Sequence, residues 1–310
     1  MFKFDKIKLA QLPTPIEFLE NISKEAVCDV WIKRDDISGK YGGNKVRKLE
    51  YLYSDVLKKN VNYLVIYGSY GSHHILANCI YSEVIRCKVV SVFFPQHPTQ
   101  HVIENFKKSV RLCEKYYHSP NPISSLVKAF IVYLMLRAKG KKPYLVPPGS
   151  TSPLSSLGFV SAALELKDQI EREHIPKPDF IIIPAGTLGS CVGLAAGLSI
   201  LKIDSQVLGI SVVGKILANS ITAGYLLKNL FKILGLKPQK TNLKIVSDFV
   251  GKGYGYETED GEKAKRLFFN EEGITLDSTY TAKAASAIFN LPEIKNKKIL
   301  FWHTLNSNKI

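Results

Sequence analysis

The lysine at position 45 stands where an amine can do covalent chemistry. Lys45 follows Gly42, Gly43 and Asn44, whose flexible backbone allows the side chain to be aimed inward, and it precedes a segment with helical spacing. An amine that attacks a carbonyl compound needs a lowered pKa, which burial or a nearby cation provides. Lys48, one helical turn later on the same face, is a candidate for that cation or for a phosphate ligand. The alternative interpretation of Lys45 is a solvated surface charge.

A glycine-containing loop has the form of a phosphate cradle. The apolar run 180–183 predicts a buried strand, and the loop 186–190 follows it and leads into a small-residue helix. N–H groups at a helix N-terminus suit a phosphate, and glycines permit its close approach. The glycine spacing fits neither a dinucleotide-binding fingerprint nor a P-loop, which indicates a phosphorylated cofactor other than NAD or ATP. Lysine and cradle together suggest a Schiff base with pyridoxal phosphate, although a glycine turn that only packs a helix against a sheet is an alternative.

Two further corners carry polar groups. Ser72 stands at a predicted helix start, where its hydroxyl and backbone N–H either meet an anion or simply cap the helix. Successive helix residues point about 100° apart, so His73 and His74 are not expected to share a metal ion, and no metal site is predicted. Tyr254 and Tyr280 offer phenol groups that can donate protons or hold a carboxylate, and ordinary packed aromatic residues are the alternative.

The elements that must position these residues alternate along the whole chain. Short β-branched runs predict strands, and longer runs with a period near 3.6 predict helices, one of which has Thr99 as N-cap. The expected strands are 30–34, 63–68, 88–94, 179–186, 207–214 and 298–303, and the expected helices include 44–59, 97–116 and 157–172. This alternation predicts an α/β fold with mostly parallel, buried sheets, whose ligands bind beyond the carboxyl ends of the strands.

Composition narrows the class of protein. The chain has 310 residues with 45% apolar and 22% charged residues, which is typical of globular proteins, and no secretory signal is expected at its start. The apolar run 129–136 is too short to span a bilayer and is expected to form a buried helix. Five cysteines without a Cys-x-x-Cys pair favour a reducing, cytoplasmic compartment.

The charge is strongly positive and uneven. The formal net charge is +15, and residues 84–142 hold 11 basic and 2 acidic residues. Such a segment can attract nucleic acid or a membrane surface. No helix-turn-helix, zinc-finger or RNA-platform signature accompanies it, so neither partner is expected, and a solubilising surface or the steering of small anions is favoured.

The chain resembles the 1-aminocyclopropane-1-carboxylate deaminase/D-cysteine desulfhydrase family of pyridoxal-phosphate enzymes of fold type II. The resemblance is nearly end to end and is carried by the blocks "IKRDDISGKYGGNKVRKLEYL", "PPGSTSPLSSLGFVSAALEL", "PAGTLGSCVGLAAG", "GYGYETEDGEKAKRLFFNEEGITLDSTYTAKA" and "FWHT". It implies a large domain of residues 1–48 and 158–310, a small domain of residues 49–157, and an open, mostly parallel sheet in each. It also implies a homodimer that acts on a small amino acid.

The resemblance assigns roles by position. Lys45 corresponds to the Schiff-base lysine, Lys48 to a phosphate contact, and Thr281 to the residue that faces the pyridine nitrogen. The implied cofactor-binding set is Asn44, Lys45, Lys48, His73, Gly186, Thr187, Leu188, Gly189, Ser190 and Thr281. Ser72 corresponds to the serine that holds the substrate carboxylate, and the implied substrate set is Ser72, His73, His74, Tyr254 and Tyr280. Among these, Lys45, Ser72, Tyr254 and Tyr280 are the implied catalytic residues.

Thr281 bears on the reaction, because the deaminases place glutamate there and desulfhydrase-like members place threonine. A carboxylate keeps the pyridine nitrogen protonated, and a hydroxyl does this less well. The cofactor ring is then a weaker electron sink, which suits β-elimination. The resemblance therefore implies a D-cysteine desulfhydrase-like reaction that gives pyruvate, ammonia and sulfide. Cyclopropane-carboxylate deamination and a homologue with lost or altered activity are the alternatives, because Gly71, His73 and Leu305-Asn306 depart from the family pattern.

Overall fold

The computed structural model describes residues 4–214 and 217–308. Contacts group them into two compact units. Unit 1 holds residues 4–9 and Lys48–Thr151, and unit 2 holds Ala10–Arg47 and the described part of 152–308. The remaining residues of the predicted large domain, 1–3, 215–216 and 309–310, lie outside the described residues.

Unit 2 is built on a six-stranded sheet with the strand order β1-β2-β10-β7-β8-β9. The strands are β1 (Ile16–Phe18), β2 (Asp29–Lys33), β7 (Phe180–Ala185), β8 (Gln206–Ser211), β9 (Leu243–Val246) and β10 (Lys298–Trp302). Only the β1–β2 pairing in this sheet is antiparallel. The last strand of the chain, β10, therefore lies inside the sheet between β2 and β7.

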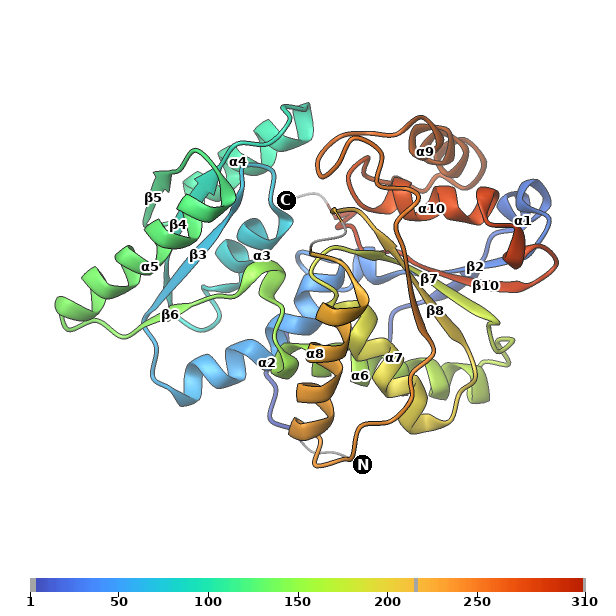
Figure 1. Ribbon diagram of the computed structural model, residues 1–310, viewed down its shortest axis with the longest axis horizontal. Helices are drawn as coiled ribbons and strands as arrows, with labels where there is room; N and C mark the ends of the chain where they lie inside the picture. Colours follow the sequence, from blue (N-terminus) through green and yellow to red (C-terminus); the bar gives the residue numbers. More distant parts are fainter. Residues whose placement is uncertain (1–3, 215–216, 309–310) are drawn as a thin grey trace. The chain divides into compact units, whose positions relative to one another are not determined.

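Helices cover both faces of this sheet (Figure 1). Helices α1 (Glu20–Ala26), α9 (Glu259–Glu272) and α10 (Thr281–Asn290) lie on one face, and α6 (Pro153–Arg172), α7 (Gly189–Leu201) and α8 (Ser220–Ile233) lie on the other. The core between the sheet and helices α1, α9 and α10 contains Ile182, Leu208, Phe268 and Phe301. Two short 3-10 turns, Asp35–Ile37 and Pro292–Ile294, complete the unit.

Unit 1 has a parallel four-stranded sheet in the order β5-β4-β3-β6. Its strands are β3 (Tyr63–Ser69), β4 (Lys88–Phe94), β5 (Lys115–His118) and β6 (Pro143–Leu145). The helices are α3 (His73–Tyr81), α4 (Gln100–Leu112) and α5 (Pro122–Ala138), with a 3-10 turn at Pro148–Ser150. Helix α2 (Asn44–Lys58) contains the change from one unit to the other, between Arg47 and Lys48. The predicted α/β architecture with mostly parallel sheets is confirmed.

Two local predictions in unit 1 are wrong. The helix expected over 97–116 begins as predicted, with the Thr99 hydroxyl accepting from the Val102 N–H, but it ends at Leu112. Residues 115–118 form β5 instead, because they pair with β4 as a parallel strand. The run 129–136 is not a buried helix either. It lies in α5, where Ala129 and Val132 pack on the sheet while one outer face stays about half exposed.

That outer face of α5 is apolar along its whole length. Its residues, each between 43% and 79% exposed, are Ile123, Leu126, Val127, Phe130, Ile131, Leu134 and Met135. The face was missed because a helix that is apolar all round gives no periodic signal, and such a helix is usually buried. None of the helices in the described residues combines the length and apolar character that crossing a membrane requires.

Candidate functional site

Lys45 occupies the second position of α2, where the chain packs tightly on neighbouring backbone. A Cβ atom at Gly42 would lie 2.0 Å from the Asp36 carbonyl oxygen. One at Gly43, which has a φ of +89°, would lie 2.4 Å from the Thr304 carbonyl oxygen. These distances exclude a side chain at either position. The two glycines therefore fix the start of α2 by close packing, whereas the sequence was interpreted in terms of flexibility.

The Lys45 amine is half-buried and belongs to a chain of hydrogen bonds. Its Nζ donates to Asn44 Oδ1 over 2.8 Å, and Asn44 Nδ2 donates to Ser190 Oγ over 3.2 Å. Burial lowers the pKa of Lys45 to about 8, although the Asp277 carboxylate acts in the opposite direction. More of the amine is therefore neutral at neutral pH than in a solvated lysine, and the neutral amine is the nucleophile. Asn44 thus joins the lysine to the glycine loop.

The glycine loop connects β7 to α7. Leu188 has a left-handed backbone conformation, with a φ of 63°, and the helix begins at Gly189. A Cβ atom added at Gly186 would meet nothing nearer than the Tyr280 ring, 3.8 Å away, so this position has space beside it. The loop therefore ends at the N-terminus of a 13-residue helix and contains a glycine with free space beside it. This combination suits a phosphate group.

Tyr254 and Tyr280 form a pair. Their hydroxyl oxygens are 2.6 Å apart, and the rings meet edge to face with centroids 5.8 Å apart. Burial and the neighbouring Tyr254 raise the pKa of Tyr280 well above its ordinary value, so its hydroxyl stays protonated at neutral pH. Unit 2 therefore brings the two tyrosines together and places one of them against the glycine loop.

Thr281, the first residue of α10, is fully buried beside an aspartate that sequence reasoning missed. The Thr281 hydroxyl donates to Asp277 Oδ2 over 2.7 Å. The same carboxylate accepts from the backbone N–H groups of Thr279, Tyr280 and Thr281, at 2.6 to 3.1 Å. A signal for it was available, because an aspartate just before a predicted helix often takes the N–H groups of the first turn.

Ser72, His73 and His74 lie at the start of α3 in unit 1. The Ser72 hydroxyl accepts from the Ile75 N–H at 3.4 Å, so the capping interpretation of this serine is observed. His74 is buried, and its Nδ1 lies 2.9 Å from Ser150 Oγ. The two histidines therefore have different surroundings, as their helical spacing predicts.

His73 is paired with a histidine from α4. The Nε2 atoms of His73 and His101 are 2.8 Å apart, and the ring centroids are 4.7 Å apart. Helix α4 approaches closely here because residue 71 is glycine: a Cβ atom at Gly71 would lie 2.7 Å from Val102 Cγ2. One packing arrangement thus links Gly71 and His73, two of the departures from the family pattern. His101 could not be found by spacing, because 28 residues separate the two histidines.

Lys48 is buried, and its amine donates to Thr151 Oγ1 over 3.0 Å within unit 1. It follows Lys45 by one turn of α2, as predicted. Arg47, between them, has a different environment: its guanidinium contacts Asp35 and Glu165 inside unit 2. The cations of this segment are therefore not equivalent.

Comparison with known proteins identifies the family. The family model "Pyridoxal-phosphate dependent enzyme" matches residues 7–304. The chain belongs to this family. It is 33% identical to the "Putative 1-aminocyclopropane-1-carboxylate deaminase" of Pyrococcus horikoshii over 97% of this chain and 92% of that protein. It is 27% identical to the D-cysteine desulfhydrase of Klebsiella pneumoniae over 97% and 94%, respectively. A crystal structure of an ACC deaminase homologue superposes with a TM-score of 0.86 at 32% identity, covering 97% of this chain and 92% of that one.

This pyridoxal-phosphate dependent enzyme has the donor types that its cofactor needs. Unit 2 supplies an amine of lowered pKa at Lys45, and Asn44 connects that amine to Ser190 at the first turn of α7. The uncrowded Gly186 and the helix N-terminus suit the cofactor phosphate. The protein is therefore an amino-acid lyase or deaminase in type, and its residues fit pyridoxal phosphate.

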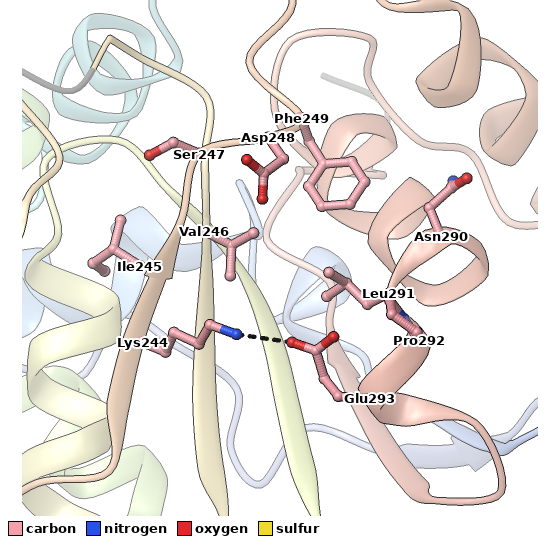
Figure 2. Close-up of a pocket in the computed structure, with 10 residues that line it drawn as sticks. All are labelled: Lys244, Ile245, Val246, Ser247, Asp248, Phe249, Asn290, Leu291, Pro292 and Glu293. Carbon is pink, nitrogen blue, oxygen red and sulfur yellow. Dashed lines mark hydrogen bonds and ion pairs between the residues drawn. The ribbon is translucent and has the colours of Figure 1, made fainter.

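A separate hollow of about 690 Å³ lies at the other end of α10 (Figure 2). It is lined by β9 with the residues that follow it to Phe249, and by residues 290–293. Lys244 and Glu293 form an ion pair of 2.8 Å across it. None of the predicted site residues lines this hollow, so it is not the candidate site of the enzyme. Within the described residues, no group of three or more His, Cys, Asp or Glu side chains could hold a metal ion.

Proposed function

We propose that this enzyme catalyses β-elimination from a small amino acid of the D-cysteine type. The observation that carries the proposal is the hydrogen-bonded chain from Lys45 through Asn44 to Ser190, which places an amine of lowered pKa next to a phosphate-type loop. The threonine at 281 supports elimination, because the resemblance associates threonine with desulfhydrase-like members.

Lys45 has two tasks in this proposal. Its amine holds pyridoxal phosphate, and the loop 186–190 with Lys48 binds the phosphate group. When bound, the cofactor supplies an electron sink for the bonds at the substrate Cα atom. When it is not bonded to the cofactor, the Lys45 Nζ would take the proton from the substrate Cα atom, and a pKa of about 8 suits this role of general base. The bond between Cβ and sulfur then breaks, and its electron pair leaves with the sulfur.

The remaining predicted residues bind and orient the substrate. The Ser72 hydroxyl and the N-terminus of α3 offer hydrogen bonds to the substrate carboxylate. The Tyr254–Tyr280 pair provides a proton donor near the leaving group, since Tyr280 keeps its proton at neutral pH. Water then hydrolyses the released aminoacrylate to pyruvate and ammonia, and sulfide is the third product.

Cyclopropane-carboxylate deamination is the second candidate, and overall similarity favours it. The two relatives with that name in Pyrococcus are 31% and 33% identical to this chain, whereas the D-cysteine desulfhydrase of Klebsiella pneumoniae is 27% identical. Deamination would give 2-oxobutyrate instead of pyruvate and sulfide. The His73–His101 pair supports a third reading, an altered substrate, because it adds imidazole groups beside Ser72.

A product assay separates these possibilities. Purified protein with pyridoxal phosphate is given D- and L-amino acids and 1-aminocyclopropane-1-carboxylate, and pyruvate, 2-oxobutyrate and sulfide are measured. We expect pyruvate and sulfide from D-cysteine, loss of both in Lys45→Ala, and unchanged rates in a control variant of the exposed Lys40, Lys40→Ala. Formation of 2-oxobutyrate alone, or turnover that survives in Lys45→Ala, would overturn the proposal.

We further propose that unit 2 is the large cofactor-binding domain and unit 1 the small domain, in a cytoplasmic homodimer. The family resemblance supports this assembly, and exposed apolar faces on α5 and α8 offer surfaces for a second copy. The α8 face includes Ile221 and Tyr225, which are 83% and 67% exposed. Sedimentation velocity of Ile221→Glu and Ile131→Glu tests which face is used, and a monomeric wild type would contradict the dimer.

A further inference from the structure

The proton of the Thr281 hydroxyl is committed to Asp277. Both acceptors within reach of this proton belong to Asp277: Oδ2 at 2.7 Å and the backbone carbonyl oxygen at 3.5 Å. The Asp277 N–H in turn donates to Thr281 Oγ1 over 2.8 Å. Within the described residues, every hydrogen bond of this hydroxyl is therefore made with Asp277.

This arrangement gives the hydroxyl a fixed polarity. A hydroxyl has one proton and two acceptor positions, so Thr281 Oγ1 keeps only one acceptor position for any further partner. The Asp277 carboxylate is itself held in place, since three backbone N–H groups and the hydroxyl all point at its two oxygens. Such acceptor-only behaviour is that of an ionised carboxylate. Thr281 therefore presents a lone pair, backed by a negative charge.

We infer that Asp277 acts through Thr281 to keep a proton on the pyridine nitrogen of the bound cofactor, which makes Asp277 a positioning residue of this enzyme. The inference rests on the proposed function and on the family resemblance, which makes Thr281 the residue that faces that nitrogen. A hydroxyl that can only accept a hydrogen bond stabilises a protonated ring nitrogen, whereas it opposes the lone pair of an unprotonated one. Thr281 thus transmits the effect of the Asp277 carboxylate, which is separated from the ring nitrogen by the Thr281 hydroxyl.

The charge of Asp277 also reaches other groups around the proposed site. It raises the pKa of Lys45 against the effect of burial, and after burial and Tyr254 it contributes to the raised pKa of Tyr280. A cofactor ring with a protonated nitrogen is a stronger electron sink than the unprotonated ring that a hydroxyl alone would leave. The threonine at 281 therefore supports elimination only through its association with desulfhydrase-like members, and not through a weaker electron sink.

The test is the nitrogen chemical shift of pyridoxal phosphate labelled with ¹⁵N in its ring and bound to the enzyme, followed against pH. We expect a protonated nitrogen in the wild type at neutral pH. In Asp277→Asn, the side-chain amide can donate to Thr281 Oγ1 and release the hydroxyl proton toward the ring. The midpoint of ring protonation should then fall by roughly 1–3 pH units, the size of effect that a nearby carboxylate has.

Thr281→Ser is the matched control, because it keeps the hydroxyl and should keep the wild-type shift, whereas Thr281→Val should lose it. An unprotonated ring nitrogen in the wild type overturns the inference, as does an unchanged midpoint in Asp277→Asn. The wild-type spectrum and Thr281→Val decide the matter if Asp277→Asn does not fold. Absorbance of the lysine-bound cofactor, measured on the same samples with Lys45→Ala as reference, shows separately whether the proposed function itself fails.

Discussion

Replacing Arg47 with methionine should destabilise the protein without touching the proposed chemistry. Arg47 lies two residues after Lys45, but its guanidinium is 1% exposed and is bonded to two carboxylates. It reaches Asp35 at 2.6 and 2.8 Å and Glu165 at 2.8 and 3.0 Å. Methionine fills similar space but leaves part of this negative charge uncompensated. Breaking a buried ion pair in this way costs about 3–5 kcal/mol of unfolding free energy.

The remaining partners set where in that range the loss should fall. Lys33 still contacts Glu165 at 2.6 Å, and the Trp302 indole still donates to Asp35 at 2.7 Å. Thr14 also remains, with its hydroxyl donating to Asp35 and its backbone N–H to Glu165, both over 2.9 Å. Each carboxylate thus keeps two donors, which points to the lower half of the range. Urea unfolding at neutral pH, followed by tryptophan fluorescence, measures the loss. The control is Lys88→Ala, which removes an exposed ion pair with Glu114 and should cost about 0–1 kcal/mol.

The loss should shrink in acid, and this gives the prediction a second, independent signature. Burial raises the pKa of Glu165, but the hydrogen bonds and charges of Arg47 and Lys33 outweigh it and bring the pKa to about 2. A depressed pKa contributes stability that is complete above the unfolded value near 4.5 and disappears as the pH falls toward 2. Arg47→Met removes most of this contribution, so the two proteins should converge between pH 4.5 and 2. A difference below about 1 kcal/mol at neutral pH, or one independent of pH, would refute the reasoning.

Three further predictions follow from the site. Gly71→Ala should cost about 1–3 kcal/mol by pushing its Cβ into Val102, seen as a lower urea midpoint, while Gly224→Ala, with open space around it, should cost nothing. The rate of cofactor attachment to the cofactor-free protein should rise with pH and level off near 8, the pKa of Lys45; a rise that continues toward 10.5 would show a solvated lysine. Tyr254→Phe should lower kcat by roughly 10²-fold or more with little change in KM, and an equal change in both would indicate a binding role.

The sequence pattern predicted the features that depend on residues close together in the chain, namely strands, helix starts and loops. The alternation of apolar runs gave the parallel strands, and the Thr99 cap was visible because a capping residue and the helix start that it caps are neighbours in sequence. Lys45 and the glycine loop were found because their residue types are unusual for their positions. Their meeting through Asn44 could not be predicted by spacing, since 146 residues separate Asn44 from Ser190.

Long-range partners account for most of what was missed. His101 and Asp277 have ordinary residue types in ordinary positions, and only the folded chain shows that one contacts His73 and the other Thr281. The exposed face of α5 was missed for a different reason. A helix apolar on all sides is expected to be buried, and composition cannot show that one side of it lacks a neighbour within the described chain.

The position of β10 has a consequence for how the enzyme is made. The segment that carries Lys45 packs against Thr304, and the Gly42 N–H donates to the Asn306 side chain, which lies 264 positions further along the chain. During synthesis, β2 gains its parallel neighbour only after β10 has been made, and the lysine is not held in its final place until residues 298–306 have left the ribosome. Cofactor attachment therefore requires β10 and the residues that follow it to Asn306, and a variant truncated before Lys298 should not acquire its cofactor.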